Sequence, residues 1–249
     1  MSTSRSALSF SVTAVLLILT FHRSAGAFDV CKAPQEITRF WVKLPTITRA
    51  VRSHEPLVIV AIGSSSTEGV GASDSAHTYP SLLRNELHRV WPDLPITVIN
   101  KGVAGEMAFE MLARFERDVL PYHPQLVIWQ TGSNQALRSN NIMGYSDTLK
   151  DGLSRLKAAE ADVVLMDPQF APKVIASPIH MSVVDSIRAV ARDANVAVFQ
   201  RFAIMRHWIL TNQFTIDEII SSDGIHMNNV SYGCIAHLLA NSLVAIASP

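Results

Sequence analysis

The sequence predicts an α/β protein, a three-layer α/β/α sandwich around a central parallel sheet of about five strands. Two observations predict this fold. Short, nearly continuous apolar runs alternate with longer amphipathic stretches, and no internal repeat or low-complexity linker interrupts residues 28–249. Apolar strands that alternate with helices are typical of a parallel sheet covered on both faces. Right-handed crossovers make three layers the simplest topology.

Five apolar runs are the predicted strands, because each is short and most are rich in β-branched residues. They are Leu57–Ile62, Ile96–Asn100, Leu126–Gln130, Val163–Met166 and Val196–Phe199. The amphipathic stretches between them are the predicted helices, Tyr79–Val90, Ala108–Val119, Asp147–Ala159 and Ser182–Asp193. A last amphipathic run, Tyr232–Ala245, is expected to form a helix that packs on the sheet.

The first 27 residues resemble a signal peptide rather than part of the fold. Arg5 gives a positive start, Ala14–Leu19 an apolar centre, and Ala25-Gly26-Ala27 a small-residue cleavage site. Cleavage after Ala27 leaves residues 28–249 as a single domain, exported to the periplasm or secreted. An uncleaved amino-terminal anchor is the alternative.

Charge and cysteine content exclude some classes of function. Lys and Arg together number 21, as do Asp and Glu, so no net charge attracts nucleic acid or an acidic membrane. No His and Cys cluster has metal-ligand spacing, and we expect neither a metal nor another cofactor. After export, Cys31 and Cys234 can form a disulfide or remain two buried thiols, and the sequence leaves both open.

Polar residues follow the first four predicted strands. These loops are Gly63–Thr67, Lys101–Gly105, Thr131–Asn134 and Asp167–Phe170. Because parallel strands end on one edge of the sheet, and ligands bind at that edge, we expect the loops to lie close together. A serine there becomes a nucleophile if a histidine is brought to it, and Asp223-Gly224-Ile225-His226 offers a histidine with an acid three residues before it.

The same loops offer donors for an oxyanion, the negative charge that develops on an attacked carbonyl oxygen. The backbone N–H of Ser65 is one candidate and that of Gly102 a second, because glycine lets the backbone approach a ligand closely. The side-chain amide of Asn134 is a third. Alternatively, the glycines only shape turns and Asn134 caps the next helix.

These stretches resemble the four sequence blocks of the SGNH (GDSL-type) hydrolase superfamily, in order and over residues 57 to about 240. The matching blocks are Gly63–Thr67, Asn100–Gly102 with Gly105, Gly132–Asn134, and Asp223–His226. The resemblance implies a flavodoxin-like SGNH hydrolase fold. It also implies a catalytic triad of Ser65, Asp223 and His226, with an oxyanion hole formed by Ser65, Gly102 and Asn134.

Three serines in a row make the position of the nucleophile ambiguous. Both Gly63 and Thr67 align with the first block when Ser65 is the nucleophile, which favours it over Ser64 and Ser66. The chain departs from the family pattern at Ser64, where the family carries an aspartate. No Gly-x-Ser-x-Gly elbow is present, which argues against the α/β-hydrolase alternative.

Eight further histidines compete with His226, and each is expected to play another role. They are His22 in the signal, His54, His88 and His207 near strands or in helices, His77 and His180 in loops, His123 at a strand entrance, and His237 in the last helix. The loop after the fourth strand is expected to line the acyl or sugar pocket, with Gln169 and Phe170 nearest the substrate. A purely structural connector is the alternative.

We therefore expect an exported serine esterase that hydrolyses a small acyl ester, such as acetyl, on a polysaccharide through an acyl-enzyme. The alternatives are an acyltransferase to a sugar hydroxyl, a lysophospholipase or thioesterase, and a non-catalytic carbohydrate-binding module. The expected partner is a small-molecule or polysaccharide ester, with no nucleic acid and no stable membrane insertion after signal cleavage.

Overall fold

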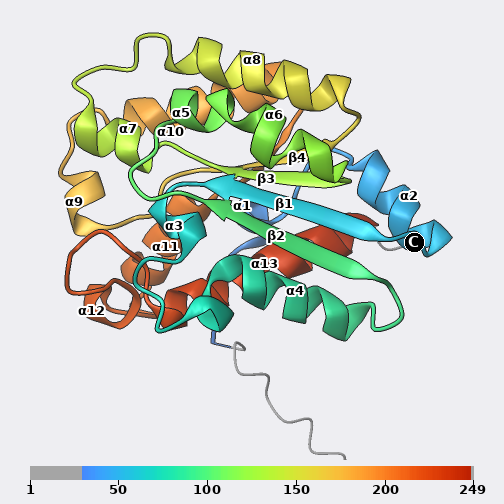
Figure 1. The fold of residues 1–249 in the computed structure, drawn as a ribbon. Coiled ribbons are helices and arrows are strands. Elements are labelled where there is room, and N and C mark those ends of the chain that lie inside the picture. Colours follow the sequence, from blue (N-terminus) through green and yellow to red (C-terminus); the bar gives the residue numbers. More distant parts are fainter. Residues whose placement is uncertain (1–29, 248–249) are drawn as a thin grey trace, which may run out of the picture.

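A computed structural model describes residues 30–247 and shows one five-stranded, fully parallel sheet in the order β2-β1-β3-β4-β5 (Figure 1). The strands are β1 (Leu57–Gly63), β2 (Ile96–Gly102), β3 (Leu126–Gln130), β4 (Asp162–Met166) and β5 (Ala197–Phe199). The predicted fold class is confirmed, and each predicted strand lies within two residues of an observed one. The predicted signal peptide lies outside the described residues.

Helices cover both faces of the sheet, which gives the three layers seen in Figure 1. One face carries α5 (Ala108–Ala113), α6 (Phe115–Asp118), α8 (Tyr145–Ala158) and α10 (His180–Ala194), and the other carries α2 (Pro45–Ser53), α4 (Tyr79–Val90) and α13 (Asn229–Ala247). The remaining helices are α1 (Gln35–Thr38), α3 (Ser65–Glu68), α7 (Ser133–Arg138), α9 (Pro172–Ile175), α11 (Arg201–Leu210) and α12 (Ile216–Ile219), with 3-10 turns at Ser75–His77 and Leu120–Tyr122.

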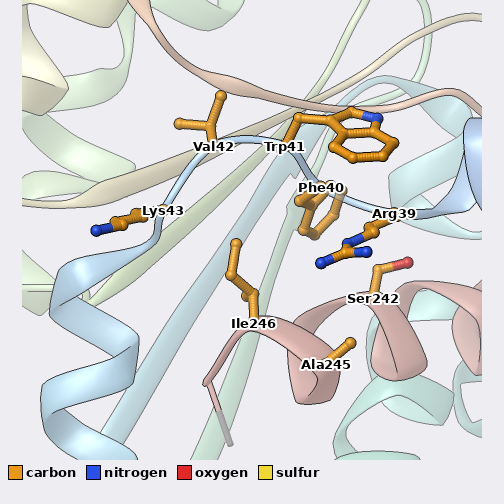
Figure 2. A pocket seen from close by; sticks show the side chains of 8 residues that line it. All are labelled: Arg39, Phe40, Trp41, Val42, Lys43, Ser242, Ala245 and Ile246. Carbon is orange, nitrogen blue, oxygen red and sulfur yellow. The ribbon is translucent and has the colours of Figure 1, made fainter.

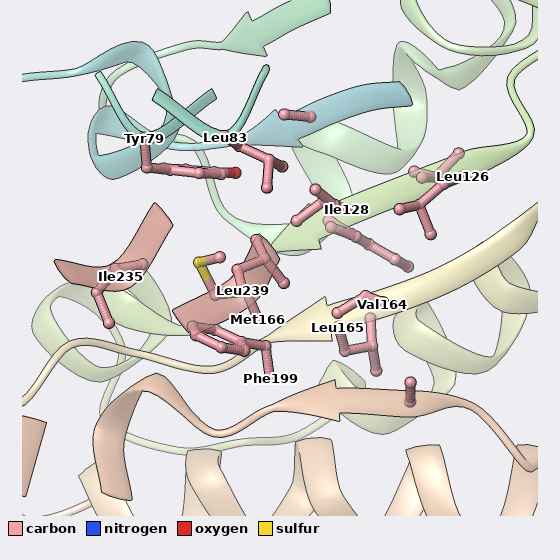
Figure 3. Close-up of a cluster of buried hydrophobic side chains, with 14 of the residues drawn as sticks. Tyr79, Leu83, Leu126, Ile128, Val164, Leu165, Met166, Phe199, Ile235 and Leu239 are labelled. Atoms are coloured by element: carbon pink, nitrogen blue, oxygen red, sulfur yellow. The ribbon is translucent and has the colours of Figure 1, made fainter. Parts of the chain in front are cut away.

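The core between the sheet and the α4 and α13 layer is apolar and closely packed (Figure 3). Leu83 of α4, Ile128 of β3 and Leu239 of α13 are each fully buried in it. By length and composition α13 could cross a membrane, but 67% of its most apolar stretch is buried inside the protein. Packing between α4 and the sheet therefore accounts for its apolar composition.

A disulfide joins Cys31 to Cys234 and ties the first described residues to α13. Both cysteines are buried. Two side chains near α11 hold the same amino-terminal segment, since Trp208 Nε1 donates to the Lys32 carbonyl at 2.9 Å and Gln213 Nε2 donates to the Val30 carbonyl at 2.5 Å. Of the two states that the sequence left open for the cysteines, the structure has the bridged one.

One predicted helix is broken in two. The stretch Ala108–Val119 forms α5 and α6, separated by Arg114, whose backbone leaves the helical region at φ −109° and ψ 10°. The Arg114 side chain is only 6% exposed and its guanidinium donates to the Lys101 carbonyl at 2.6 Å and to Glu106 at 2.8 Å. The break therefore lets one buried arginine hold the loop after β2.

Candidate active site

The carboxyl end of β1 turns directly into α3, and Ser65 is the first residue of that short helix. The turn requires glycine at position 63, because a Cβ there would lie 2.1 Å from the Oγ1 atom of Thr67. The Gly63 residue also pairs with Gly102 across the sheet, so the loops after β1 and β2 begin side by side.

The three consecutive serines have three different surroundings. Ser64 is buried, and both its N–H and its hydroxyl donate to Gln130 Oε1, at 3.0 and 3.2 Å. Ser66 is also buried, and its hydroxyl lies 3.5 Å from Gln169 Oε1. Only Ser65 is partly exposed, and its Oγ lies 2.8 Å from His226 Nε2.

The contacts of Ser64 give a physical reason for its departure from the family aspartate. Gln130 Oε1 accepts hydrogen bonds, and it also accepts one from Thr67 Oγ1 at 3.1 Å. An aspartate at position 64 would set a carboxylate, which has no proton to donate, against that acceptor oxygen. The serine and the glutamine therefore fit one another in this chain.

Asp223 and His226 form one tight turn immediately before α13. The Oδ2 atom of Asp223 lies 2.5 Å from His226 Nδ1, and its Oδ1 atom accepts from the backbone N–H groups of Ile225 and His226 at 2.8 and 2.9 Å. The turn needs a positive φ, which Gly224 supplies at +70°. A second segment supports it, since the Lys173 N–H donates to the Gly224 carbonyl at 3.0 Å.

The electrostatics of this turn keep Asp223 ionised. Partial burial by itself raises the pKa of the Asp223 carboxyl, but the hydrogen bonds from His226 and Ile225 outweigh it and leave this pKa below its ordinary value. A carboxylate at this position accepts the Nδ1 proton of His226, which leaves Nε2 without a proton and able to accept the Ser65 hydroxyl proton. Seryl oxygen, imidazole and carboxylate thus form one continuous chain.

Of the three predicted oxyanion donors, Gly102 does not fit. Its N–H donates to Asn100 Oδ1 at 2.9 Å, and a Cβ on it would lie 2.0 Å from the Glu68 nitrogen, so its role is close packing beneath α3. The N–H of Gly105, three residues on, has no hydrogen-bond partner within residues 30–247, and neither has that of Ser65. Gly105, whose N–H is unbonded within these residues, is therefore a better candidate than Gly102 for the second backbone donor.

Three side chains fix the loop that carries Gly105. Asn134 Nδ2 donates to the Glu106 carbonyl at 2.9 Å, which leaves its second amide proton available. Arg138 donates to the Gly105 carbonyl at 2.5 Å, and Arg114 binds the Glu106 carboxylate. Asn134 thus lies beside Gly105, on the first turn of α7.

The structure argues against one of the two predicted substrate contacts. The side chain of Gln169 is only 1% exposed and its amide is bonded to protein groups, so it does not line a surface open to substrate. Phe170 is partly buried and packs edge-on against Phe202, with ring centroids 5.4 Å apart. The sequence placed both residues in the correct loop, but the direction of a loop side chain is not set by the strand that precedes it.

The other described histidines have different partners. His77 pairs with Asp74, His180 stacks on Phe202, and His237 lies 2.8 Å from Glu86. His54 and His123 end helical turns with positive φ. None of these contacts involves Ser65, and within residues 30–247 no group of three His, Cys, Asp or Glu side chains is arranged to hold a metal.

A cavity of about 210 Å³ lies far from this constellation (Figure 2). Arg39 and the exposed Trp41 line one side, and Ser242 and Ile246 of α13 the other. His226 precedes the first turn of α13, and at ~1.5 Å rise per residue Ser242 lies about 20 Å further along that helix. The cavity is therefore separate from the triad.

Comparison with known sequences finds one matching family and two kinds of curated relative. The family model described as the non-GDSL lipase-like family matches residues 30–249. An acetylxylan esterase of Geobacillus stearothermophilus is 28% identical over 121 residues, which is 44% of this chain and 55% of that protein. A thioesterase 1/protease 1/lysophospholipase L1 of Escherichia coli (strain K12) is 29% identical over 108 residues, 43% of this chain and 49% of that one. The chain thus matches about half the length of these curated relatives.

Solved structures with the same fold include two esterases. A two-domain esterase active on acetylated mannans, co-crystallised with mannopentaose, superposes with a TM-score of 0.72 at 18% identity, over 85% of this chain and 56% of that one. A mutant acetyl-xylooligosaccharide esterase from Geobacillus superposes with a TM-score of 0.63 at 19% identity, over 78% of this chain and 94% of that one. At such identities the likeness concerns the fold.

Proposed function

Because the chain belongs to the non-GDSL lipase-like family, whose model spans residues 30–249, we propose that it is a serine esterase that hydrolyses small O-acyl esters. One observation carries the proposal, namely the chain of hydrogen bonds from Ser65 Oγ through His226 to Asp223, at 2.8 and 2.5 Å. A histidine that accepts from a serine and is oriented by a carboxylate is the arrangement that makes a serine hydroxyl nucleophilic.

The reaction proceeds in two halves. Ser65 Oγ attacks the ester carbonyl carbon while its proton passes to His226 Nε2. The tetrahedral intermediate then collapses, the alcohol leaves with that proton, and the acyl group remains on Ser65. A water molecule attacks the acyl-enzyme, gives a proton to His226, and the acid leaves as the proton returns to Ser65 Oγ.

The oxyanion of each intermediate is held by three donors. These are the Ser65 N–H, the Gly105 N–H and the free amide proton of Asn134. Their contribution is electrostatic, since they meet the negative charge only as it develops. Asp223 holds the imidazole in its productive tautomer and stabilises the imidazolium form.

A small acyl group on a polysaccharide is the substrate class we favour. The support is the likeness to an acetylxylan esterase in sequence and to esterases active on acetylated mannans and xylooligosaccharides in fold. The likeness to a thioesterase and lysophospholipase supports a second candidate, an enzyme for longer acyl chains. Acyl-chain length separates the two.

The experiment is a series of kcat/KM measurements on p-nitrophenyl acetate, butyrate, octanoate and palmitate, and on acetylated against deacetylated xylan and mannan. We expect the acetyl ester to be preferred, and Ser65→Ala to lower kcat by about 10⁴-fold or more. The matched control is Ser242→Ala, a buried serine at the far end of α13. A preference for octanoate or palmitate would contradict the proposed substrate class and favour an enzyme for longer acyl chains, with the same mechanism.

Two further outcomes decide between the remaining alternatives. Fluorophosphonate labelling followed by mass spectrometry should place the adduct on Ser65. An adduct on Ser64 or Ser66 would identify that serine as the nucleophile instead. The absence of both an adduct and esterase activity would support a binding module. Transfer of acetyl to an added sugar in preference to water identifies an acyltransferase.

We also propose that the enzyme is exported and cleaved after Ala27, leaving residues 28–249 as one domain. The support is the apolar run Ala14–Leu19 with its small-residue site, together with the Cys31–Cys234 disulfide, since such bonds persist in oxidising compartments. Amino-terminal sequencing of protein recovered outside the cytoplasm should begin at Phe28. An intact Met1 there identifies an uncleaved anchor.

A further inference from the structure

Gln169 lies in the loop after β4, and the hydrogen bonds of its buried side chain reach three separate segments. Its Oε1 atom accepts from the Ser133 hydroxyl at 2.6 Å and lies 3.5 Å from the Ser66 hydroxyl. Its Nε2 atom donates to the Ile225 carbonyl at 3.0 Å. One planar amide therefore connects α3, α7 and the turn before α13.

These three partners of Gln169 are each the immediate neighbour of a residue in the proposed machinery. Ser66 follows the nucleophile, Ser133 precedes the oxyanion amide of Asn134, and Ile225 precedes the general base His226. The three segments are far apart in the sequence. Within the described residues, no other side chain forms hydrogen bonds with all three of them.

The orientation of the amide is fixed by Arg201. This guanidinium is fully buried; its Nη2 donates to Gln169 Oε1 at 3.0 Å, and its Nε to the Asp167 carbonyl at 2.9 Å. A guanidinium can only donate, so the amide oxygen must face Arg201 and the amide nitrogen must face Ile225. The direction of all the bonds follows from that one contact.

We propose that Gln169 is a positioning residue, which holds the nucleophile, the oxyanion amide and the base in register without touching the substrate. The inference rests on the proposed esterase function. Loss of the amide would leave the Ile225 carbonyl without this donor and the Ser133 hydroxyl without its acceptor. The three segments could then shift relative to one another, and a displacement of about 1 Å can lower a rate by up to about 100-fold.

The test compares two glutamines that each accept a hydrogen bond through Oε1 and donate one to a backbone carbonyl through Nε2. Gln169→Met keeps the length of the side chain and removes its hydrogen bonds. Gln125→Met is the matched control, because Gln125 Oε1 accepts from the Val58 N–H at 2.7 Å and its Nε2 donates to the His123 carbonyl at 3.2 Å, at the opposite edge of the sheet. Both variants are measured as the full chain, with active sites counted by complete fluorophosphonate titration.

For Gln169→Met we expect kcat per titrated site to fall by about 10- to 100-fold, while KM changes by less than about threefold, because the loss acts on the chemical step. The same variant should be phosphonylated more slowly. Gln125→Met should keep the wild-type kcat even if its melting temperature falls as much as that of Gln169→Met. A purely structural glutamine would lower only the melting temperature.

Each outcome has a defined consequence. An active wild type whose Gln169→Met variant has the kcat of Gln125→Met overturns this inference alone. A wild type without esterase activity overturns the proposed function, and this inference with it. Should Gln169→Met not fold, Ser133→Ala removes only the shortest of the bonds; a lower kcat supports the positioning role, and an unchanged kcat contradicts it.

Discussion

Two aspartates near the site, Asp223 and Asp167, have pKa values shifted in opposite directions. The side chain of Asp223 is 42% exposed, and hydrogen bonds lower its pKa despite partial burial. Asp167 is fully buried, and burial raises its pKa to about 6, although the Phe202 N–H, Arg188 and Arg201 all favour its charged form. The first carboxylate can orient a catalytic histidine at neutral pH, whereas the second belongs to the structure beneath the site.

The same contrast separates an outer from an inner layer of polar residues. The outer layer consists of Ser65, Asn134, Asp223 and His226, all at least partly exposed. The inner layer consists of Gln130, Asp167, Gln169 and Arg201, all buried. Substitutions in the outer layer should lower kcat at little cost in stability, and those in the inner layer should alter stability, with Gln169 as the residue that connects the two.

The largest expected effect belongs to the outer layer. Asp223→Asn replaces the acceptor of the Nδ1 proton by an amide that can favour the wrong tautomer of His226, and kcat should fall by roughly 10⁴-fold. The measurement is kcat on p-nitrophenyl acetate at neutral pH. Asp217→Asn, on an exposed position of α12, is the control. A loss below tenfold for Asp223→Asn would remove this residue from the triad.

Asn134→Ala tests the oxyanion donor that we propose in the outer layer. Loss of one such donor typically costs about 10²- to 10³-fold in kcat. We expect this loss with a nearly constant KM and a small change in the free energy of unfolding. Asn141→Ala, an exposed asparagine beyond α7, should retain wild-type kcat. An Asn134→Ala variant that loses stability and keeps kcat would move Asn134 to the inner layer.

Gly102→Ala tests the close packing of β2 against α3. The added Cβ would lie 2.0 Å from the Glu68 nitrogen, so the backbone must move, and we expect unfolding to become easier by about 3 kcal/mol or more. In Gly105→Ala the added Cβ has no neighbour closer than Arg138 Nη1 at 3.8 Å. The only cost is the backbone strain of an alanine at a φ of +82°, which lowers the free energy of unfolding by about 1–2 kcal/mol. Urea unfolding of both variants checks the order, and equal losses contradict it.

The smallest effect is the pH dependence of the inner layer. Because the pKa of Asp167 is raised to about 6 in the folded protein, the folded state binds this proton more tightly than the unfolded chain. Its contribution to stability is therefore present below about pH 4 and lost as pH rises through about 6. Asp167→Asn should remove this dependence, about 1–3 kcal/mol between these limits.

The measurement is the free energy of unfolding in urea at pH 4, 5, 6 and 7 for wild type and Asp167→Asn. The free energy of unfolding of the wild type minus that of the variant should become smaller as pH rises from 4 to 7. A difference that is constant with pH would show that Asp167 is ionised throughout, which is the behaviour of the outer layer.

The sheet and its main helices could be predicted because their signals are local and repeated. Tyr79–Val90 is α4 to the residue, and all five strands were found as apolar runs. Helix α11 was not predicted, because its apolar residues are not confined to one face. The break at Arg114 was also missed. It depends on a tertiary contact of the Arg114 side chain with the Lys101 carbonyl, which the pattern of residues within the helix does not reveal.

The candidate site shows the same limit. The resemblance to SGNH hydrolases is confirmed, and Ser65, Asp223 and His226 do meet in the structure. Gly102 ends β2 and Gly105 lies in the loop after it, and sequence alone does not show that the Gly102 N–H is already bonded to Asn100. Gln169 lies in the expected loop, but its side chain points into the protein instead of toward a substrate. Its direction is set by Arg201 and Ile225, which belong to other elements.

The disulfide between Cys31 and Cys234 has a consequence for how the chain is made. Its partners are 203 residues apart and are the only cysteines in the chain, so no incorrect pairing within one molecule exists. Because chains emerge from the amino terminus, Cys31 keeps a free thiol until α13 has been synthesised. An incomplete chain therefore carries a thiol at Cys31 that has no partner within its own molecule until Cys234 has been made.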